Sequence, residues 1–359
     1  MHTKVNESTF AGQPIYVGID VHLKSWKVTV MAGDIHYKTF SAPPEGDKLA
    51  NYLKQNFPGA DYYSAYEAGF CGFSVHRELT RCGIKSIIVN PADIPTTDKE
   101  RRQKEDKRDS RKIAKTLQAG QLKAIFVPSD KTQHDRILLR SRDIIVKDLT
   151  RNRNRVKSLL YLEGINIPKR FDSRSSYWSN AFIQWLSEIT FAHNTARSGL
   201  DALLEMVHHL RSLLLRVTRQ TRELSKTPPY HENVKLLISV PGIGPLTAMR
   251  LLTELETLNR FSDFDQLCSY VGLVPSTNSS GETEIVSGIS PRKNSRLRGA
   301  LIESAWIAIR NDPALLHSYQ NLCKRIPGNR AIIRIAKKLL RRIKYVLRTK
   351  QTYERGIIK

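Results

Sequence analysis

The feature that most constrains this chain is a short apolar run near the N-terminus, Tyr16–Asp20, which ends on a carboxylate. A second strand-favouring run, Val28–Val30, follows after a polar turn. This spacing predicts a β-hairpin whose first strand carries Asp20 to the edge of a sheet. Taken alone, Asp20 is more simply a surface residue at the end of a core strand. A metal site would require other carboxylates to return to the same edge.

The rest of residues 15–127 alternates strand and helix patterns. We predict a helix over 46–57, a strand over 62–66 that ends on Glu67, a helix that ends near Gly83, and a strand over 85–89. Residues 123–128 are interpreted as one more strand that closes the domain. This order of elements is typical of an α/β domain with a mixed sheet.

A densely charged segment at 99–112 leads into a further helix. Within it Asp106 and Asp109 stand three residues apart, so both carboxylates share one helix face. Such a run is ordinarily a solvated helix with many ion pairs. Two strand-end acids followed by two helix acids, however, provide the hard oxygen ligands that Mg²⁺ needs beside a phosphate.

The charge balance points to nucleic acid. Lys and Arg outnumber Asp and Glu 58 to 34, which gives a net charge of +24. A membrane surface is the competing acidic partner, but no apolar run approaches the roughly 20 residues needed to span a bilayer. The first residues lack the apolar core of a signal peptide. The four cysteines are scattered without CxxC pairing, which suits a reduced cytoplasmic protein and argues against zinc.

The middle of the chain reads as two long helices. The first is basic and covers about 135–162, and residues 164–196 are interpreted as irregular. In the second, apolar residues from Leu200 to Leu224 alternate spacings of three and four, a heptad seam. The helices could pair within one chain or between protomers, and a coiled-coil arm favours an oligomer.

A glycine turn opens the last third of the chain. Apolar residues 236–240 precede Pro-Gly-Ile-Gly, which contains Gly242 and Gly244, and a second helical pattern follows. This order is typical of a helix-hairpin-helix, in which backbone N–H groups at a helix N-terminus bind a DNA phosphate. The alternative is an ordinary tight connection between two helices.

A serine-rich segment and a basic segment come next. The polar loop 276–281 precedes four cations that could face it: Arg292, Lys293, Arg296 and Arg298. A serine hydroxyl there could attack a phosphodiester while guanidinium groups stabilise the developing charge. Serines beside glycine are more often turn residues or helix caps. The final helix, about 331–349, is amphipathic and basic; we expect its apolar stripe in the core and its basic face on phosphates rather than on a membrane surface.

Six stretches, in the same order, resemble the DEDD insertion-sequence transposases, also called bridge-RNA-guided recombinases, and their relatives the pilin-gene invertases. They are YVGIDVHLKSW, SAYEAGFCGF, KEDKRDSRKIA, VPGIGPLTA, YVGLVPSTNSSG and SGISPRKNSRLRGAL. The chain departs from the pattern where Pro291 and Lys293 replace the usual Lys and Gly. The resemblance covers nearly the whole chain.

The resemblance implies three domains. They are an α/β RNase H-like (RuvC-type) catalytic domain over 1–130, a long helical coiled-coil arm over 131–228, and a mainly α transposase domain over 229–359 with the helix-hairpin-helix and a catalytic serine. Position by position, it implies that Mg²⁺ is held by Asp20, Glu67, Asp106 and Asp109. It also implies that Ser280 is the nucleophile and forms a transient phosphoserine link to DNA. Ser279 and, less well, Ser290 are the substitutes.

The function expected from the resemblance is that of a Mg²⁺-dependent DNA transposase, a serine recombinase that moves its own insertion sequence. Its partners would be donor and target DNA, a noncoding bridge RNA as guide, and further copies of the chain in a dimer or tetramer, with no membrane involved. It would be cytoplasmic and associated with the bacterial nucleoid. The alternatives are a protein-only site-specific invertase, a RuvC-like junction nuclease without a serine step, and a non-catalytic nucleic-acid-binding protein.

Overall fold

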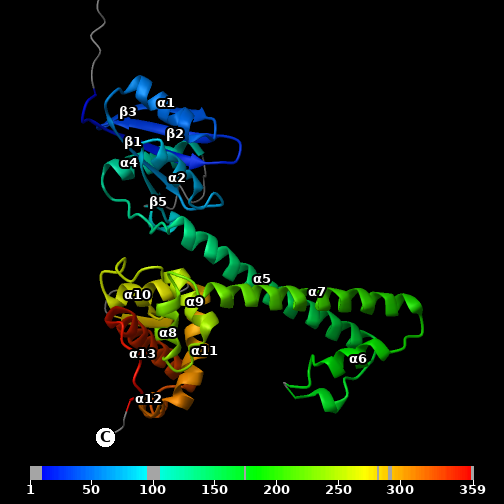
Figure 1. The fold of residues 1–359 in the computed structure, drawn as a ribbon. Coiled ribbons are helices and arrows are strands. Elements are labelled where there is room, and N and C mark those ends of the chain that lie inside the picture. The colour runs from blue at the N-terminus through cyan, green and yellow to red at the C-terminus, as the bar shows by residue number, and fades with distance from the viewer. Residues whose placement is uncertain (1–9, 95–105, 174, 281–282, 290–292, 357–359) are drawn as a thin grey trace, which may run out of the picture. The chain divides into compact units, whose positions relative to one another are not determined.

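The computed structural model describes residues 10–94, 106–173, 175–280, 283–289 and 293–356, without the side chains of 106–108 and 275–289. The chain forms two compact units, residues 1–127 and 128–359, which are drawn together in Figure 1 and described separately below. The finer division of the second unit into an arm and a transposase domain stays a prediction.

The N-terminal unit is built on a five-stranded sheet in the order β3-β2-β1-β4-β5. β1 and β2 form the predicted antiparallel hairpin, β3 extends it, and β4 and β5 run parallel to β1. The mixed sheet is therefore confirmed, whereas β3 was not predicted. The strands are β1 (Pro14–Val21), β2 (Trp26–Ala32), β3 (Ile35–Ala42), β4 (Asp61–Glu67) and β5 (Lys85–Val89).

Helices cover the two faces of this sheet differently. α1 (Gly46–Asn56) and α2 (Ser74–Arg81) pack on the face that carries the alternating apolar residues of β1, and α2 ends before Gly83 as predicted. α4 (Asp106–Gln118) packs against β1, β2 and β4, and a short 3₁₀ turn, Pro91–Asp93, precedes it.

The prediction of a strand at 123–128 is wrong. This segment makes a single isolated bridge, between Ala124 and Val89. Its apolar run is only four residues long and ends at Pro128, which has no N–H to donate to a ladder. Pairing with the edge of the sheet therefore does not extend beyond that bridge.

Two long helices open the C-terminal unit and pack against each other: α5 (Asp130–Leu162) and α7 (Asn194–Leu224). α5 begins earlier than expected because the Ser129 hydroxyl accepts a hydrogen bond from the Thr132 N–H. The predicted seam residues Leu200 and Val207 are buried with Leu149 and Val156 of α5. The two helices therefore pair within one chain, whereas their part in an oligomer stays a prediction.

The stretch between these helices is more ordered than the irregular segment expected. It contains a 3₁₀ turn, Lys169–Phe171, and α6 (Asn180–Glu188), which begins at the cap Ser179. Aromatic side chains join both to the long helices; Phe182 is packed against Phe171, Trp178 and Trp185. Aromatic residues of this segment thus form much of its core.

The remaining helices surround one large apolar core. They are α8 (His231–Ile238), α9 (Pro245–Leu255), α10 (Phe264–Val271), α11 (Ser295–Asn311), α12 (Pro313–Cys323) and α13 (Gly328–Thr349). The predicted apolar stripe of α13 is buried, from Ile332 to Val346. Across the described residues, no helix is long and apolar enough to cross a membrane.

The prediction of a polar loop at 276–281 is wrong for residues 276–280. Residues 275–280 form a strand, β6 (Pro275–Ser280), which pairs antiparallel with β7 (Thr283–Ile289). β-branched residues in β7 favour an extended partner, and polar Ser and Thr side chains in β6 concealed the strand pattern.

Candidate functional site

Two of the predicted acids leave the sheet side by side. β1 and β4 are parallel neighbours, with Ile19 aligned with Tyr66. The next residue of each strand is Asp20 and Glu67, so both carboxylates lie at the same edge. Asp20 is partly buried and Glu67 is exposed. By strand alternation, both face the side of the sheet that carries Gly18 and Ala65.

α4 covers that same face at unusually close range. A Cβ on Gly18 would lie 2.1 Å from the carbonyl oxygen of Ser110 and 2.4 Å from the N of Ala114. Only glycine permits this approach. The buried Ser110 hydroxyl also lies 2.9 Å from the Thr29 hydroxyl of β2, so a polar contact fixes the helix on the sheet.

The direction of α4 brings its first turns toward the acids. Its last residue, Gln118, donates to Asp34, which follows the end of β2, and that end pairs with Ile15 at the start of β1. α4 therefore runs antiparallel to β1, and its N-terminal end is directed toward the Asp20 end of the strand. Asp109 is partly buried there, whereas the side chain of Asp106 lies outside the described residues.

The acid edge, meaning Asp20, Glu67, Asp106 and Asp109, has the donor chemistry that Mg²⁺ prefers, because all four side chains are carboxylates. Among the described side chains, which exclude that of Asp106, no three His, Cys, Asp or Glu residues are grouped closely enough to hold a metal ion. Mg²⁺ is commonly bound by one or two carboxylates, with water and substrate phosphates completing its shell. The pair of strand-end acids fits that mode.

A residue without a predicted role contacts the acid edge. The His22 Nε2 lies 3.0 Å from a carboxylate oxygen of Asp20. His22 is in the turn between β1 and β2, and its ring contacts the Asp20 carboxylate. Its position two residues after a strand-end acid is the only sequence signal for this contact.

In the C-terminal unit, Ser280 is the last residue of β6 and is aligned with Thr283 of β7. Ser279 is its neighbour on the same strand. Side-chain positions of both serines lie outside the described residues, as do Ser290 and Arg292 altogether. The structure thus gives Ser280 a backbone position near the tip of a hairpin.

The other predicted phosphate-binding cations differ in their surroundings. The Arg296 Nε lies 3.5 Å from the Asp143 carboxylate of α5, and Arg298 donates to the carbonyl oxygen of Gly272 at 3.4 Å. Lys293 is exposed. Arg296 and Arg298 therefore help to hold the base of the hairpin.

The two glycines of the turn between α8 and α9 have different environments. Gly242 has φ +84°, and a Cβ there would lie 2.3 Å from the carbonyl oxygen of Ser304. Gly244 is exposed, has open space around it and forms the N-cap of α9. Gly242 serves a tight helix connection, and Gly244 leaves the α9 N-terminus accessible.

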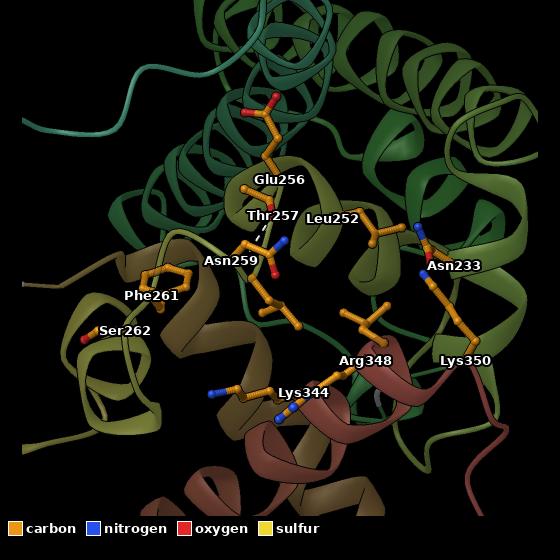
Figure 2. Close-up of a pocket in the computed structure, with 12 residues that line it drawn as sticks. Asn233, Leu252, Glu256, Thr257, Asn259, Phe261, Ser262, Lys344, Arg348 and Lys350 are labelled. Atoms are coloured by element: carbon orange, nitrogen blue, oxygen red, sulfur yellow. Dashed lines mark hydrogen bonds between the residues drawn. The ribbon is translucent and has the colours of Figure 1, made fainter.

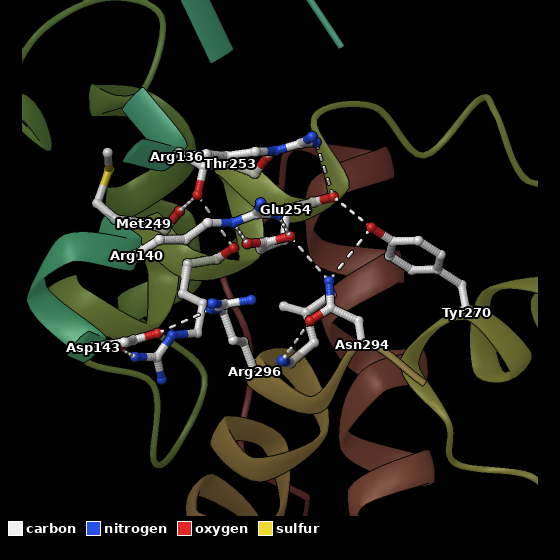
Figure 3. Close-up of polar contacts among 11 residues, drawn as sticks. Arg136, Arg140, Asp143, Met249, Thr253, Glu254, Tyr270, Asn294 and Arg296 are labelled. Atoms are coloured by element: carbon white, nitrogen blue, oxygen red, sulfur yellow. Dashed lines mark hydrogen bonds and ion pairs between the residues drawn. The ribbon is translucent and has the colours of Figure 1, made fainter. Parts of the chain in front are cut away.

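A buried carboxylate that the sequence reading missed organises this unit (Figure 3). Both oxygens of Glu254 on α9 accept from Arg140 of α5, each at 3.0 Å, and one also accepts from Asn294 at 2.9 Å. Burial raises the pKa of Glu254, but hydrogen bonds and charge from Arg140, with help from Asn294 and Arg136, outweigh it and hold that pKa below its ordinary value. A glutamate among the leucines of α9 was the available signal.

The Glu254 network also holds both ends of the hairpin segment. Tyr270, just before it, donates its hydroxyl to the Glu254 carbonyl at 3.2 Å. Asn294, just after it, bonds the Glu254 carboxylate, caps α11 and donates its N–H to the Tyr270 carbonyl at 2.9 Å. The base of β6–β7 is thereby tied to α5 and α9.

Comparisons with known proteins agree over most of the chain. Residues 17–163 match the family model described as the DEDD transposase of the IS110 type, and residues 234–320 match that of the IS116/IS110/IS902 transposase family. The first match contains the acid edge, and the second contains the glycine turn and the hairpin.

Individual proteins similar to this chain are also named as transposases. The chain is 30% identical to the putative transposase y4qE of Sinorhizobium fredii over 68% of its length, which spans 58% of that protein. It is 27% identical to the putative transposase y4rJ of the same organism, covering 90% of this chain and 87% of that one. It is also 27% identical to the transposase for insertion sequence element IS1533 of Leptospira borgpetersenii, covering 81% and 84%. The chain therefore belongs to the IS110 family of DEDD insertion-sequence transposases.

Proposed function

We propose that this protein is a recombinase that cuts and rejoins DNA to move its insertion sequence, using the acid edge and Ser280. The observation that carries the proposal is the register of β1 and β4, which sets Asp20 beside Glu67 under the N-terminal end of α4. Family membership supports DNA as the substrate.

The acid edge would hold Mg²⁺ through Asp20, Glu67, Asp106 and Asp109. When bound, the ion supplies Lewis-acid polarisation of a phosphoryl oxygen and orients the scissile phosphate. The chain's own contribution is to fix the carboxylates: the sheet sets the spacing of the first two, Gly18 lets α4 approach, and His22 contacts Asp20.

Ser280 would perform the covalent step. Its oxygen forms a bond to phosphorus while the bond from phosphorus to one deoxyribose oxygen breaks, and the serine proton passes to that leaving oxygen. The strand is rejoined when a deoxyribose hydroxyl attacks the phosphoserine and releases the serine. Cations of the segment after the hairpin, such as the exposed Lys293, would stabilise charge on the phosphoryl oxygens.

The partners follow from the charge and the family. Donor and target DNA, and a guide RNA transcribed beside the gene, would neutralise much of the +24 charge. α5 and α7 would support a dimer or tetramer. Sequencing the RNA that co-purifies from the native host tests the guide: one structured transcript from beside the gene supports it, and random host RNA favours a protein-only invertase.

A junction nuclease is the second candidate, because all four acids lie in the N-terminal unit and need no serine. Both candidate functions use the same metal site, so they differ only in whether a serine takes part in the reaction.

The test of the acid edge is Mg²⁺-dependent cleavage of DNA that carries the element's ends. Asp20→Asn preserves shape and the contact to His22 but removes the charge, so we expect cleavage to fall roughly 100-fold or more. Asp61→Asn is the matched control, because Asp61 begins β4 at the opposite edge and pairs with Lys85. Equal cleavage by the two variants would show that Asp20 does not belong to the metal site.

A further inference from the structure

A pocket of about 670 Å³ lies in the C-terminal unit (Figure 2). It is lined by Asn233 of α8, the end of α9, the loop after it and the C-terminal turns of α13. Its size is that of pockets that bind small organic ligands. None of the residues assigned above to metal binding or to the serine step lines it.

One wall of this pocket is cationic. Lys344 and Arg348 stand four apart on α13, and Lys350 follows the helix end. Of the three, Lys350 bonds a neutral partner, Asn233, at 2.7 Å, and none forms an ion pair within the part of the chain that the structure describes. Lys344 acts on one carboxylate nearby, that of Asp263, whose pKa it helps to lower. Three cations against that single acid leave a positive excess at the cavity, which favours an anionic ligand.

The acid of the pocket does not neutralise that wall. Glu256 directs its carboxylate to the start of α5, where both oxygens accept from the Ser129 N–H at 3.1 and 3.3 Å. Figure 2 shows it pointing away from Lys344 and Arg348. The cavity itself is left positive.

The rest of the lining is half polar, from Asn233, Thr257, Asn259 and Ser262, and half apolar, from three leucines and Phe261. Leu252 is buried at the floor, Leu347 lies beside the cations on α13, and Phe261 closes another side. A cationic rim next to an aromatic and aliphatic surface matches a nucleotide, which carries a phosphate and a flat base. A duplex cannot use both parts, because its bases stay in the stack.

We propose that this pocket binds one unpaired nucleotide of a nucleic-acid strand. The phosphate lies against Lys344, Arg348 and Lys350, and the base lies against Phe261 and the leucines. The proposal goes beyond the recombinase chemistry, since it uses neither the acid edge nor Ser280. It gives the C-terminal unit a way to hold a single strand, of DNA or of RNA, without reading its sequence.

The first test measures binding of labelled oligo(dT) and oligo(U) ten-mers and of a ten-base-pair duplex by the full chain, by fluorescence anisotropy without Mg²⁺. Arg348→Gln should weaken single-strand binding about tenfold and reduce the slope of log affinity against log salt by about 0.7. Arg310→Gln is the matched control, because Arg310 is exposed on α11 and lines no part of this pocket. Equal effects of the two variants on single strands would overturn the proposal.

The second test locates the base. A ten-mer with one 5-iodouracil is photo-crosslinked to the protein, and the modified peptide is identified by mass spectrometry. We expect the crosslink on the peptide that contains Phe261, and its loss in Phe261→Leu while duplex binding is unchanged. A crosslink with DNA, with RNA or with both supports the pocket and identifies its strand; crosslinks confined to other peptides contradict it. Because neither assay involves cleavage, a failure of the recombinase chemistry would leave both results standing.

Discussion

At the residue scale, the strand-end acids and the buried Glu254 differ in how well the sequence predicts their surroundings. The neighbouring positions of Asp20 and Glu67 were predictable because each follows an apolar strand, and parallel strands bring their ends to one edge. Glu254 was not predictable as a centre, because its partners Arg140 and Asn294 are 114 and 40 residues away. Only the folded chain brings those three together.

The first prediction concerns the pH dependence that Glu254 confers. The ordinary pKa of its carboxyl group is 4.5, and the folded pKa lies below it. The stabilisation of the fold by the charged Glu254 carboxylate is therefore complete above about pH 4.5, and it is lost as the pH falls through the folded pKa. Glu254→Gln removes the charge that pairs with Arg140, so we expect the free energy of unfolding at pH 7 to fall by roughly 3 kcal/mol.

Urea unfolding of the C-terminal unit, followed from pH 7 to pH 3, measures this effect. The difference between wild type and Glu254→Gln should shrink as the pH falls, because wild type loses the same interaction. Glu303→Gln, an exposed glutamate of α11, should change little at any pH. A constant difference across the pH range would refute the assignment of the low pKa to Glu254.

At the scale of elements, periodic patterns were reliable and irregular ones were not. The β1–β2 hairpin, α4 and the buried stripe of α13 were predicted from spacing alone. β3 was missed because most of its residues are exposed or only partly buried, which leaves no clean alternation. α6 is short and surrounded by aromatics, and β6 consists mostly of Ser, Thr and Asn, so tertiary packing and strand pairing decided both.

The second prediction concerns the docking of α4 on β1. Gly18→Ala places a Cβ 2.1 Å from the Ser110 carbonyl oxygen, and a backbone atom cannot move aside cheaply. We expect α4 to lose contact with the sheet at a cost above about 3 kcal/mol. Hydrogen exchange should show faster exchange of the amides at 109–118, while those of α1 keep more of their protection.

Gly299→Ala is the matched control for Gly18→Ala. Gly299 lies inside α11 with nothing within 4 Å of its added Cβ, so alanine should preserve or slightly raise helix stability. Unchanged exchange at 109–118 in Gly18→Ala would mean that α4 does not depend on this close approach.

At the scale of the whole molecule, the charge of +24 dominates interactions with nucleic acid. Affinity that arises from phosphate neutralisation falls steeply as salt rises, because bound counterions are released on association. The long basic helix α5 and the basic surface of α13 belong to the same C-terminal unit, so much of this charge lies outside the N-terminal sheet domain.

The third prediction follows from that charge. Raising salt from about 50 to about 200 mM should weaken duplex DNA binding by roughly 1,000-fold. Sucrose at matched osmolality is the control and should leave the affinity unchanged. If the affinity changed less than tenfold with salt, phosphate contacts would be few. Base contacts would then account for most of the binding.

The central proposal is that cutting and rejoining of DNA require both the acid edge and a serine of the β6–β7 hairpin. Its most direct test is a search for a covalent protein–DNA adduct, formed with Mg²⁺ and end-containing DNA and mapped by mass spectrometry. We predict a phosphoserine link at Ser280 that is absent from Ser280→Ala and from Asp20→Asn and present in Ser279→Ala. An adduct that persists in Ser280→Ala, or cleavage by wild type with no adduct at all, would contradict the account.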